Sequence, residues 1–251
     1  METTAQDRTV RYYLLTLLLR SAVFALLVLS AALAPARFEA WLSAGPVRFT
    51  PLTAVWLALM LSMVFRLFPS RWESLGCQKE FSLRFCPTGQ AVPREEVQSA
   101  DRGAWRVLLS WAVLNGAFFL AHWRGWLSDR FLVCLAGFYG VCDIVCILFF
   151  CPFQAWMMHN RCCTTCRIYN WDYAMLCTPL LALRGVLSLS ACALSLVLLL
   201  RWEWTYRRRR ERFFQCANGA LACGACQEHL CRYKRALARS IRAAGRDRRD
   251  S

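Results

Sequence analysis

Cysteine is the residue type in this sequence best suited to chemistry, and it is concentrated in one stretch. The chain has 15 cysteines, and seven of them lie between Cys142 and Cys177, around a polar turn over residues 161–167. A thiolate is both a nucleophile and a metal ligand, so neighbouring thiols in a polar turn indicate metal ligation or redox exchange. Arg161 and Arg167 begin and end the turn, and they are expected to lower the pKa of its thiols. The cysteines of the turn are Cys162, Cys163 and Cys166.

A second group of cysteines lies in the C-terminal tail, with the spacing C-x6-C-x2-C-x4-C. Four thiolates within such a short stretch can surround one ion, and the C-x2-C step resembles the chelating unit of structural zinc sites. Iron–sulfur clusters are also held by four thiolates, so the spacing leaves both cofactors open. The alternative is a reduced tail without metal. The four residues are Cys216, Cys223, Cys226 and Cys231.

Two cysteines precede proline, at Cys86-Pro87 and Cys151-Pro152. These pairs resemble the C-x3-C-P pattern of membrane proteins that hold iron–sulfur clusters at a helix end, although Cys146 and Cys151 are one residue further apart. Cys151 therefore joins the predicted metal ligands of the turn and the tail. The remaining cysteines of the apolar segments are interpreted as packing residues, because free cysteine behaves as a small hydrophobe. They include Cys134, Cys142, Cys146 and Cys192.

Long apolar runs must position these groups. The chain is 57% hydrophobic, against about 45–50% in soluble domains. Each run approaches the length needed to cross a bilayer core of about 30 Å as a helix. The sequence therefore predicts an all-α, polytopic membrane protein with about five transmembrane helices, a Cys-rich surface loop and a basic amphipathic tail. The expected membrane domain is 1–200, the expected tail is 201–251, and the expected spans are 12–34, 51–68, 105–122, 131–152 and 176–200.

The first run could also be a signal peptide, because Ala32-Leu33-Ala34 resembles a cleavage site. Arg20 interrupts the run, however, and its apolar part is longer than the about 7–15 residues usual in a signal peptide. We therefore expect an uncleaved span.

Three ionisable residues fall inside apolar runs: Arg20, Asp143 and Arg184. Charges at this depth are costly and normally pair or face a cavity. Asp143 and Arg184 lie at similar distances from the polar turn, so they are predicted to pair, with Arg20 as the competing partner.

The formal net charge of +15 favours anionic lipid headgroups as a partner of the tail, together with the bilayer itself. Residues 227–243 are predicted to form an amphipathic basic helix, which would lie on lipid or cover the rest of the tail. Nucleic acid is excluded as a partner because no recognised module accompanies the charge.

The topology poses a conflict, because the loop 69–104 and the tail are both basic, yet three expected spans separate them. A re-entrant segment within 105–200 would resolve it. We expect an integral protein of the cell (plasma) membrane with a cytoplasmic tail.

The leading functional hypothesis is a cysteine-ligated iron–sulfur or zinc centre at the membrane surface, with an electron-transfer or redox role and a protein redox partner. The first alternative is a membrane thiol–disulfide oxidoreductase that uses Cys162 or Cys163 with Cys166. The second is a carrier or assembly protein with structural cysteines, in which the buried charges line a polar path.

Overall fold

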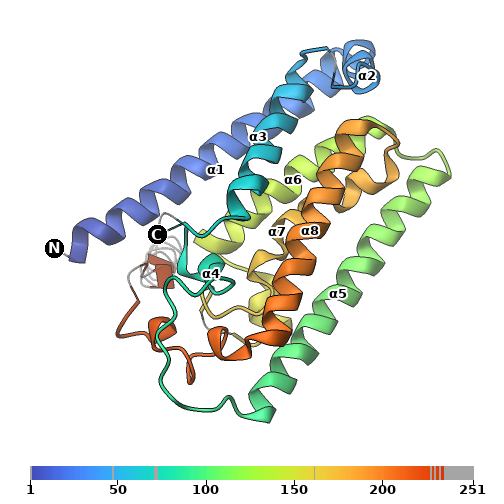
Figure 1. Ribbon diagram of the computed structural model, residues 1–251. Coiled ribbons are helices and arrows are strands. Elements are labelled where there is room, and N and C mark those ends of the chain that lie inside the picture. The colour runs from blue at the N-terminus through green and yellow to red at the C-terminus, as the bar shows by residue number, and fades with distance from the viewer. Residues whose placement is uncertain are drawn as a thin grey trace, which may run out of the picture.

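The structure is a computed structural model that describes residues 2–46, 48–70, 73–160, 162–226, 228, 230, 231, 233 and 234. Within these residues it is all-helical, with no strand (Figure 1), which confirms the all-α part of the predicted fold class. The principal helices are α1 (Glu2–Leu33), α2 (Pro35–Ser43), α3 (Pro51–Arg66), α4 (Leu75–Gln78), α5 (Arg94–Trp123), α6 (Asp129–Leu148), α7 (Asp172–Cys177) and α8 (Val186–Arg208). Short turns are η1 (Phe153–Met157), η2 (Tyr169–Trp171), η3 (Thr178–Ala182), η4 (Arg210–Arg212) and η5 (Gly219–Leu221).

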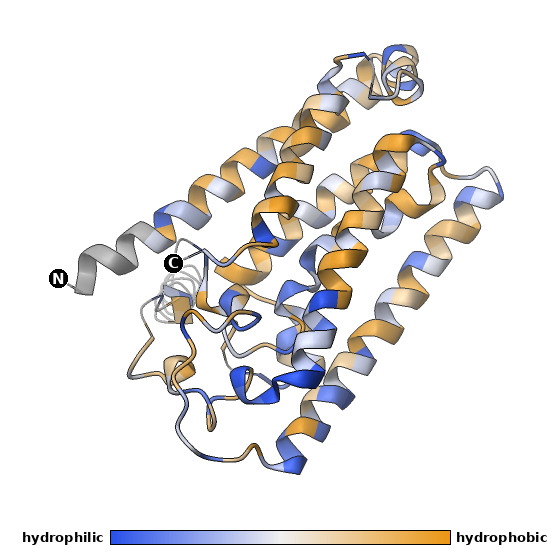
Figure 2. Cartoon of the chain, viewed as in Figure 1, coloured by the Kyte–Doolittle hydropathy of each residue, from blue (hydrophilic) through white to orange (hydrophobic). Residues whose placement is uncertain are grey.

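Four helices are long and apolar enough to cross a membrane: the Thr9–Leu33 part of α1, and α5, α6 and α8. The apolar helix α3 has 16 residues and is shorter. Figure 2 shows hydrophobic residues along the length of these helices, and α1 leaves Leu15, Leu18 and Leu19 about two-thirds exposed. Large exposed apolar faces are typical of surfaces that contact lipid or another protein.

Local signals determine where several helices begin. The hydroxyl of Thr50 accepts a hydrogen bond from the Thr53 N–H at 3.2 Å and caps α3, and Ser128 caps α6 in the same way. Helix α5 starts directly after Pro93 and carries Glu95 and Glu96 in its first turn, where acidic side chains complement the helix dipole. Because α5 starts there, it is 30 residues long, or about 45 Å, and extends well beyond the expected 105–122.

The expected span 176–200 differs from the structure, in which α8 begins at Val186. The preceding residues 172–185, here called the return segment, consist of α7, η3 and an extended Leu183. Pro179 lies in the first turn of η3, and proline cannot donate the backbone hydrogen bond that a continuous helix would need. The apolar run therefore folds back on itself instead of forming one helix.

The return segment lies antiparallel to α8. Trp171 Nε1, just before the segment, donates to Glu203 Oε1 at 2.8 Å, and Cys192 Sγ donates to the Cys177 carbonyl at 3.4 Å. Val186 follows the segment directly, so the segment covers the depth of α8 from residue 203 to residue 186, which is about 26 Å.

Because of this return, the polar segments meet at one end of the bundle, here called the polar end: the described residues of 67–93, of 149–171 and of 209–234. Gly219 N donates to the Cys86 carbonyl at 2.8 Å, and Arg212 Nη1 donates to the Glu80 carbonyl at 3.1 Å. The start of α1 joins them, since the hydroxyls of Tyr13 and Tyr169 lie 3.3 Å apart. Figure 1 shows the same gathering, with α2 at the opposite end.

Asp143 pairs with Arg20 across the packed helices α1 and α6. Arg20 Nη1 lies 2.8 Å from Asp143 Oδ2 and also donates to the Gly140 carbonyl at 2.8 Å. The predicted Asp143–Arg184 pair is wrong, because the return segment carries Arg184 to the far end of α8, where it is exposed. The competing partner named from the sequence is the one that the structure contains.

We predict that Asp143→Asn destabilises the protein, because the positive charge of Arg20 then has no carboxylate beside it. Removing one partner of an ion pair that is shielded from water costs about 3–5 kcal/mol. The unfolding midpoint in detergent micelles measures this, with Arg184→Gln as the matched control that should change little. The double change Arg20→Gln with Asp143→Asn should recover part of the loss, and an equal loss in all three variants would contradict the pairing.

Candidate functional site

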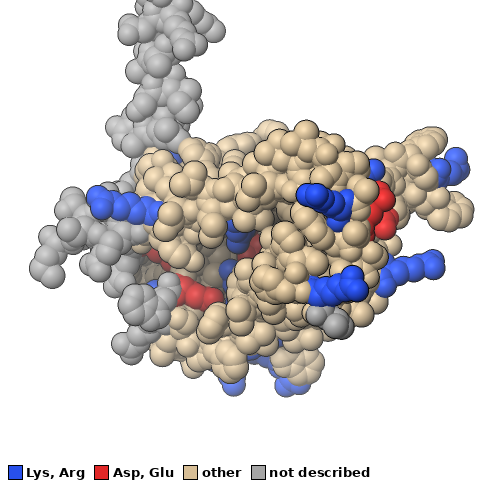
Figure 3. All heavy atoms as spheres, turned by 90° about the horizontal axis from the view of Figure 1, so that it is seen from above, with Lys and Arg blue, Asp and Glu red and all other residues tan. Residues whose placement is uncertain are grey.

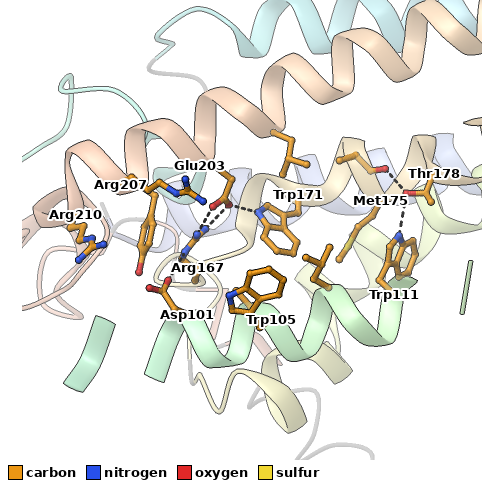
Figure 4. Close-up of a pocket in the computed structure, with 15 residues that line it drawn as sticks. Asp101, Trp105, Trp111, Arg167, Trp171, Met175, Thr178, Glu203, Arg207 and Arg210 are labelled. Carbon is orange, nitrogen blue, oxygen red and sulfur yellow. Dashed lines mark hydrogen bonds and ion pairs between the residues drawn. The ribbon is translucent and has the colours of Figure 1, made fainter. Parts of the chain in front are cut away.

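A groove lies between α5 and α8, with the return segment as its floor, and has a volume of about 450 Å³. One half is apolar, and the other half, toward the polar end, carries charged side chains (Figure 4). Its lining residues are Asp101, Ala104, Trp105, Leu108, Trp111, Arg167, Trp171, Ala174, Met175, Thr178, Leu199, Glu203, Tyr206, Arg207 and Arg210.

An ion pair organises the polar half of the groove. Both terminal nitrogens of Arg167 donate to the carboxylate of Glu203, at 2.7 and 2.5 Å. Asp101 lies 3.6 Å from Arg167 Nε, and the guanidinium stacks 3.5 Å from the centre of the Tyr206 ring. Two-pronged arginine–carboxylate pairs are geometrically specific and stronger than neutral hydrogen bonds. Both groove carboxylates therefore already have a cationic partner.

Two arginines at the mouth of the groove are different. Arg207 and Arg210 are exposed and make no ion pair or side-chain hydrogen bond with any residue that the structure describes. In Figure 4, Arg207 lies beside the Arg167–Glu203 pair on the α8 side, and Arg210 lies further from Trp111 and Thr178, toward the opposite end of the groove. The mouth thus presents positive charge that no described side chain neutralises.

The apolar half runs along the bundle between α5 and the return segment. Trp105 is 62% exposed at its rim. At its inner end Trp111 Nε1 donates to Thr178 Oγ1 at 3.2 Å, and this hydroxyl in turn donates to the Ala174 carbonyl at 2.8 Å. The side-chain polar atoms of Trp111 and Thr178 are thereby hydrogen-bonded within the protein, so the inner end of this half offers an apolar surface.

The three cysteines of the turn differ in their contacts and in their burial. Cys162 Sγ contacts Thr164 Oγ1 at 2.9 Å, whereas Cys163 Sγ donates to Gln154 Oε1 at 3.3 Å. Cys166 is buried, and burial raises its pKa to about 11. Burial also raises the pKa of Cys163. The pKa of both thiols is thus shifted in the direction opposite to the expected one, because burial outweighs the neighbouring positive charges. Arg161 lies outside the described residues.

Among the residues that the structure describes, no three Cys, His, Asp or Glu side chains are close enough together to hold a metal ion. Cys216 Sγ contacts Glu96 Oε2 at 3.8 Å, and Cys223 is exposed. The metal predictions for Cys151, the turn and the tail quartet thus rest on their spacing in the sequence alone. Most of the predicted amphipathic helix 227–243 lies outside the described residues, which include only 228, 230, 231, 233 and 234 of it.

Sequence reasoning missed the carboxylates that organise the groove. Glu203 stands between Trp202 and Trp204, directly after an apolar run. A carboxylate flanked by tryptophans at the end of a span signals a buried partner, because tryptophan marks the membrane boundary and a charge at that depth needs compensation. Asp101 had no such signal, because it lies before the expected span 105–122, in a polar stretch of the sequence.

We predict that Arg167→Lys destabilises the protein by about 1–3 kcal/mol, because an ammonium cannot reproduce both hydrogen bonds to Glu203. Arg207→Lys is the matched control from the same groove and should change the unfolding midpoint little. If both variants unfold at the wild-type temperature, the ion pair does not hold the groove together.

Comparison with known protein families, with curated proteins and with solved structures finds no match to this chain. Function is therefore inferred from the geometry of the site itself.

Proposed function

We propose that this protein is a multi-pass membrane protein that binds an anionic amphiphile in the α5–α8 groove, as a receptor or carrier for it. The ligand class is an acyl chain with a phosphate or carboxylate head. The observation that carries the proposal is the junction of an apolar half-groove with two arginines at its mouth, Arg207 and Arg210, which form no ion pair with any described residue.

The head group is assigned to Arg207 and Arg210. Their guanidinium groups can donate two parallel hydrogen bonds to a phosphate or carboxylate. The carboxylate of Glu203 does not oppose an incoming anion strongly, because Arg167 neutralises it at hydrogen-bond distance. Arg210 follows the last residue of α8 by two positions, which puts the mouth at the level where a head group meets water.

The acyl chain is assigned to the apolar half. The volume of the groove, about 450 Å³, falls within the range of about 300–1,000 Å³ for ordinary ligand pockets. Trp105 and Leu108 are 62% and 41% exposed on the α5 side, so the groove opens laterally. A chain could therefore enter from the bilayer without crossing the polar end.

We propose that the polar end lies in the cytoplasm of the cell. Among the residues that the structure describes, five cationic residues lie at the far end, and Figure 3, which views the molecule from above, shows lysine and arginine side chains as separate spots rather than one continuous patch. Short loops rich in lysine and arginine stay on the cytoplasmic side. With α3 and the return segment counted as crossings, the number is even, and the loop 69–104 and the tail share one side. The five residues are Arg37, Arg48, Arg124, Arg130 and Arg184.

For topology, we predict that reporter proteins fused to the N-terminus and to the C-terminus both report the cytoplasm. A fusion in the short link between α5 and α6 should report the opposite side. An exported C-terminal fusion with a cytoplasmic N-terminal one would contradict the even number of crossings.

For ligand binding, we predict that the purified full chain binds a fluorescent monoacyl phosphate in detergent micelles. Changing Arg207 and Arg210 together to glutamine should weaken binding tenfold or more, which corresponds to about 1.4 kcal/mol. Arg208→Gln is the matched control, because Arg208 is exposed but stacks on the Trp204 ring at 4.6 Å outside the groove.

Two competitors test the contribution of the head group and that of the acyl chain separately. The same acyl chain with a neutral sugar head should compete weakly, and inorganic phosphate alone should not compete. Full competition by inorganic phosphate, or equal binding by the double variant, would overturn the proposal.

A further inference from the structure

A second cavity lies at the polar end, beside the mouth of the α5–α8 groove. Its volume is about 510 Å³, and it is bordered by the loop before α5, the first turns of α5 and the short turn η4. Arg210 lines both this cavity and the groove. A ligand whose head group binds Arg210 can therefore extend from the groove into the second cavity.

Backbone hydrogen bonds hold the walls of the second cavity in place. On the loop side, Thr88 N donates to the Ala217 carbonyl at 3.2 Å, and Gln90 N donates to Thr88 Oγ1 at 3.3 Å. On the η4 side, Phe213 N donates to the Arg210 carbonyl at 2.9 Å, and the ring of Phe213 is buried in the core. The backbone of both walls is thus fixed before a ligand binds.

The polar side chains of the second cavity form a complementary set. The guanidinium of Arg94 only donates hydrogen bonds, the carboxylate of Glu211 only accepts them, and the amides of Gln90 and Gln98 do both. None of these four side chains makes an ion pair or a side-chain hydrogen bond with any residue that the structure describes. Because a hydroxyl group is both donor and acceptor, a ring that carries several hydroxyls can bind all four.

The charges of the second cavity favour a neutral ring over a second phosphate. Once Arg210 binds the phosphate of the amphiphile, Arg94 and Glu211 remain as the charged side chains of the cavity, and their charges cancel. A second phosphate would meet the carboxylate of Glu211, and placing like charges side by side costs binding free energy. Val97 is buried and also lines the cavity, so it offers an apolar surface to the C–H groups of a ring.

We propose that the amphiphile bound by the groove carries a hexose on its phosphate, and that the second cavity binds this hexose. The inference rests on the proposed function, which supplies the sites of the acyl chain and of the phosphate. The phosphate is then a diester that lies at Arg210, between the chain and the sugar. Arg94 donates to hydroxyl oxygens of the hexose, and Glu211 accepts a hydrogen bond from one of its hydroxyls.

The test compares three competitors that share one acyl chain and differ only beyond the phosphate. They are the monoacyl phosphate, its methyl diester and its glucosyl diester, each measured against the fluorescent monoacyl phosphate on the full chain in detergent micelles. The two diesters carry the same charge, so the difference between them isolates the sugar. The glucosyl diester should bind about tenfold more tightly than the methyl diester, or better.

The outcomes distinguish this inference from the proposed function. If the monoacyl phosphate does not bind, the proposed function is wrong, and the assignment of the sugar falls with it. If the monoacyl phosphate binds but the two diesters compete equally, the assignment of the sugar alone is overturned.

Two variants test the second cavity itself. Arg94→Ala and Glu211→Ala should each remove most of the advantage of the glucosyl diester, while binding of the monoacyl phosphate stays at the wild-type level. Glu95→Ala is the matched control, because Glu95 is exposed in the same turn of α5 but does not line the cavity. A full glucosyl advantage in both cavity variants would show that the sugar binds elsewhere.

A measurement on the wild type does not depend on any variant. A glucosyl diester with a photoreactive group on the sugar should label peptides that contain residues 90–98 or 210–211, as mapped by mass spectrometry. An excess of the unlabelled glucosyl diester should suppress this labelling, whereas free glucose should not. Labelling of other segments alone contradicts the assignment.

Discussion

The backbone of the return segment imposes the constraint on which the rest of the structure depends. A broken helix at membrane depth leaves peptide groups that lipid cannot satisfy, so it is tolerated only where protein surrounds it. Tyr173, Cys177 and Pro179 are buried accordingly, and α5, α6 and α8 all pack against the segment. The groove, the gathering of the polar segments and the position of Arg184 all follow from this enclosure.

How far the sequence predicts the fold depends on the kind of signal. Apolar runs predict that α1, α3, α5 and α6 exist, because the length of an apolar run is a local property, but α1 and α5 begin well before the expected spans. The break at residues 178–185 is hidden, since a buried broken segment is as apolar as a continuous span. Only Pro179 and Gly185 mark it. The error at Arg184 follows directly, because depth was counted along a helix that the chain does not form.

The candidate site was harder to predict for a physical reason. A groove is formed by side chains from α5, α8 and the return segment, and their proximity is a tertiary property. Arg167 illustrates this: the sequence places it beside Cys166, but its guanidinium points away and binds Glu203, 36 residues further on. In contrast, the sequence does predict that Asp143 needs a cationic partner, because a short acidic side chain inside an apolar run cannot reach water at the membrane surface.

The antiparallel bridge between Pro87 and Asn218 joins two strips of backbone that are synthesised far apart in time. Thr88 N donates to the Ala217 carbonyl at 3.2 Å beside it. These bonds can close only after α5, α6, the return segment and α8 have all been synthesised, and only if both strips lie at the same end of the bundle. The bridge therefore couples the loop before α5 to the residues after α8, so the polar end is completed only when the last helix has packed.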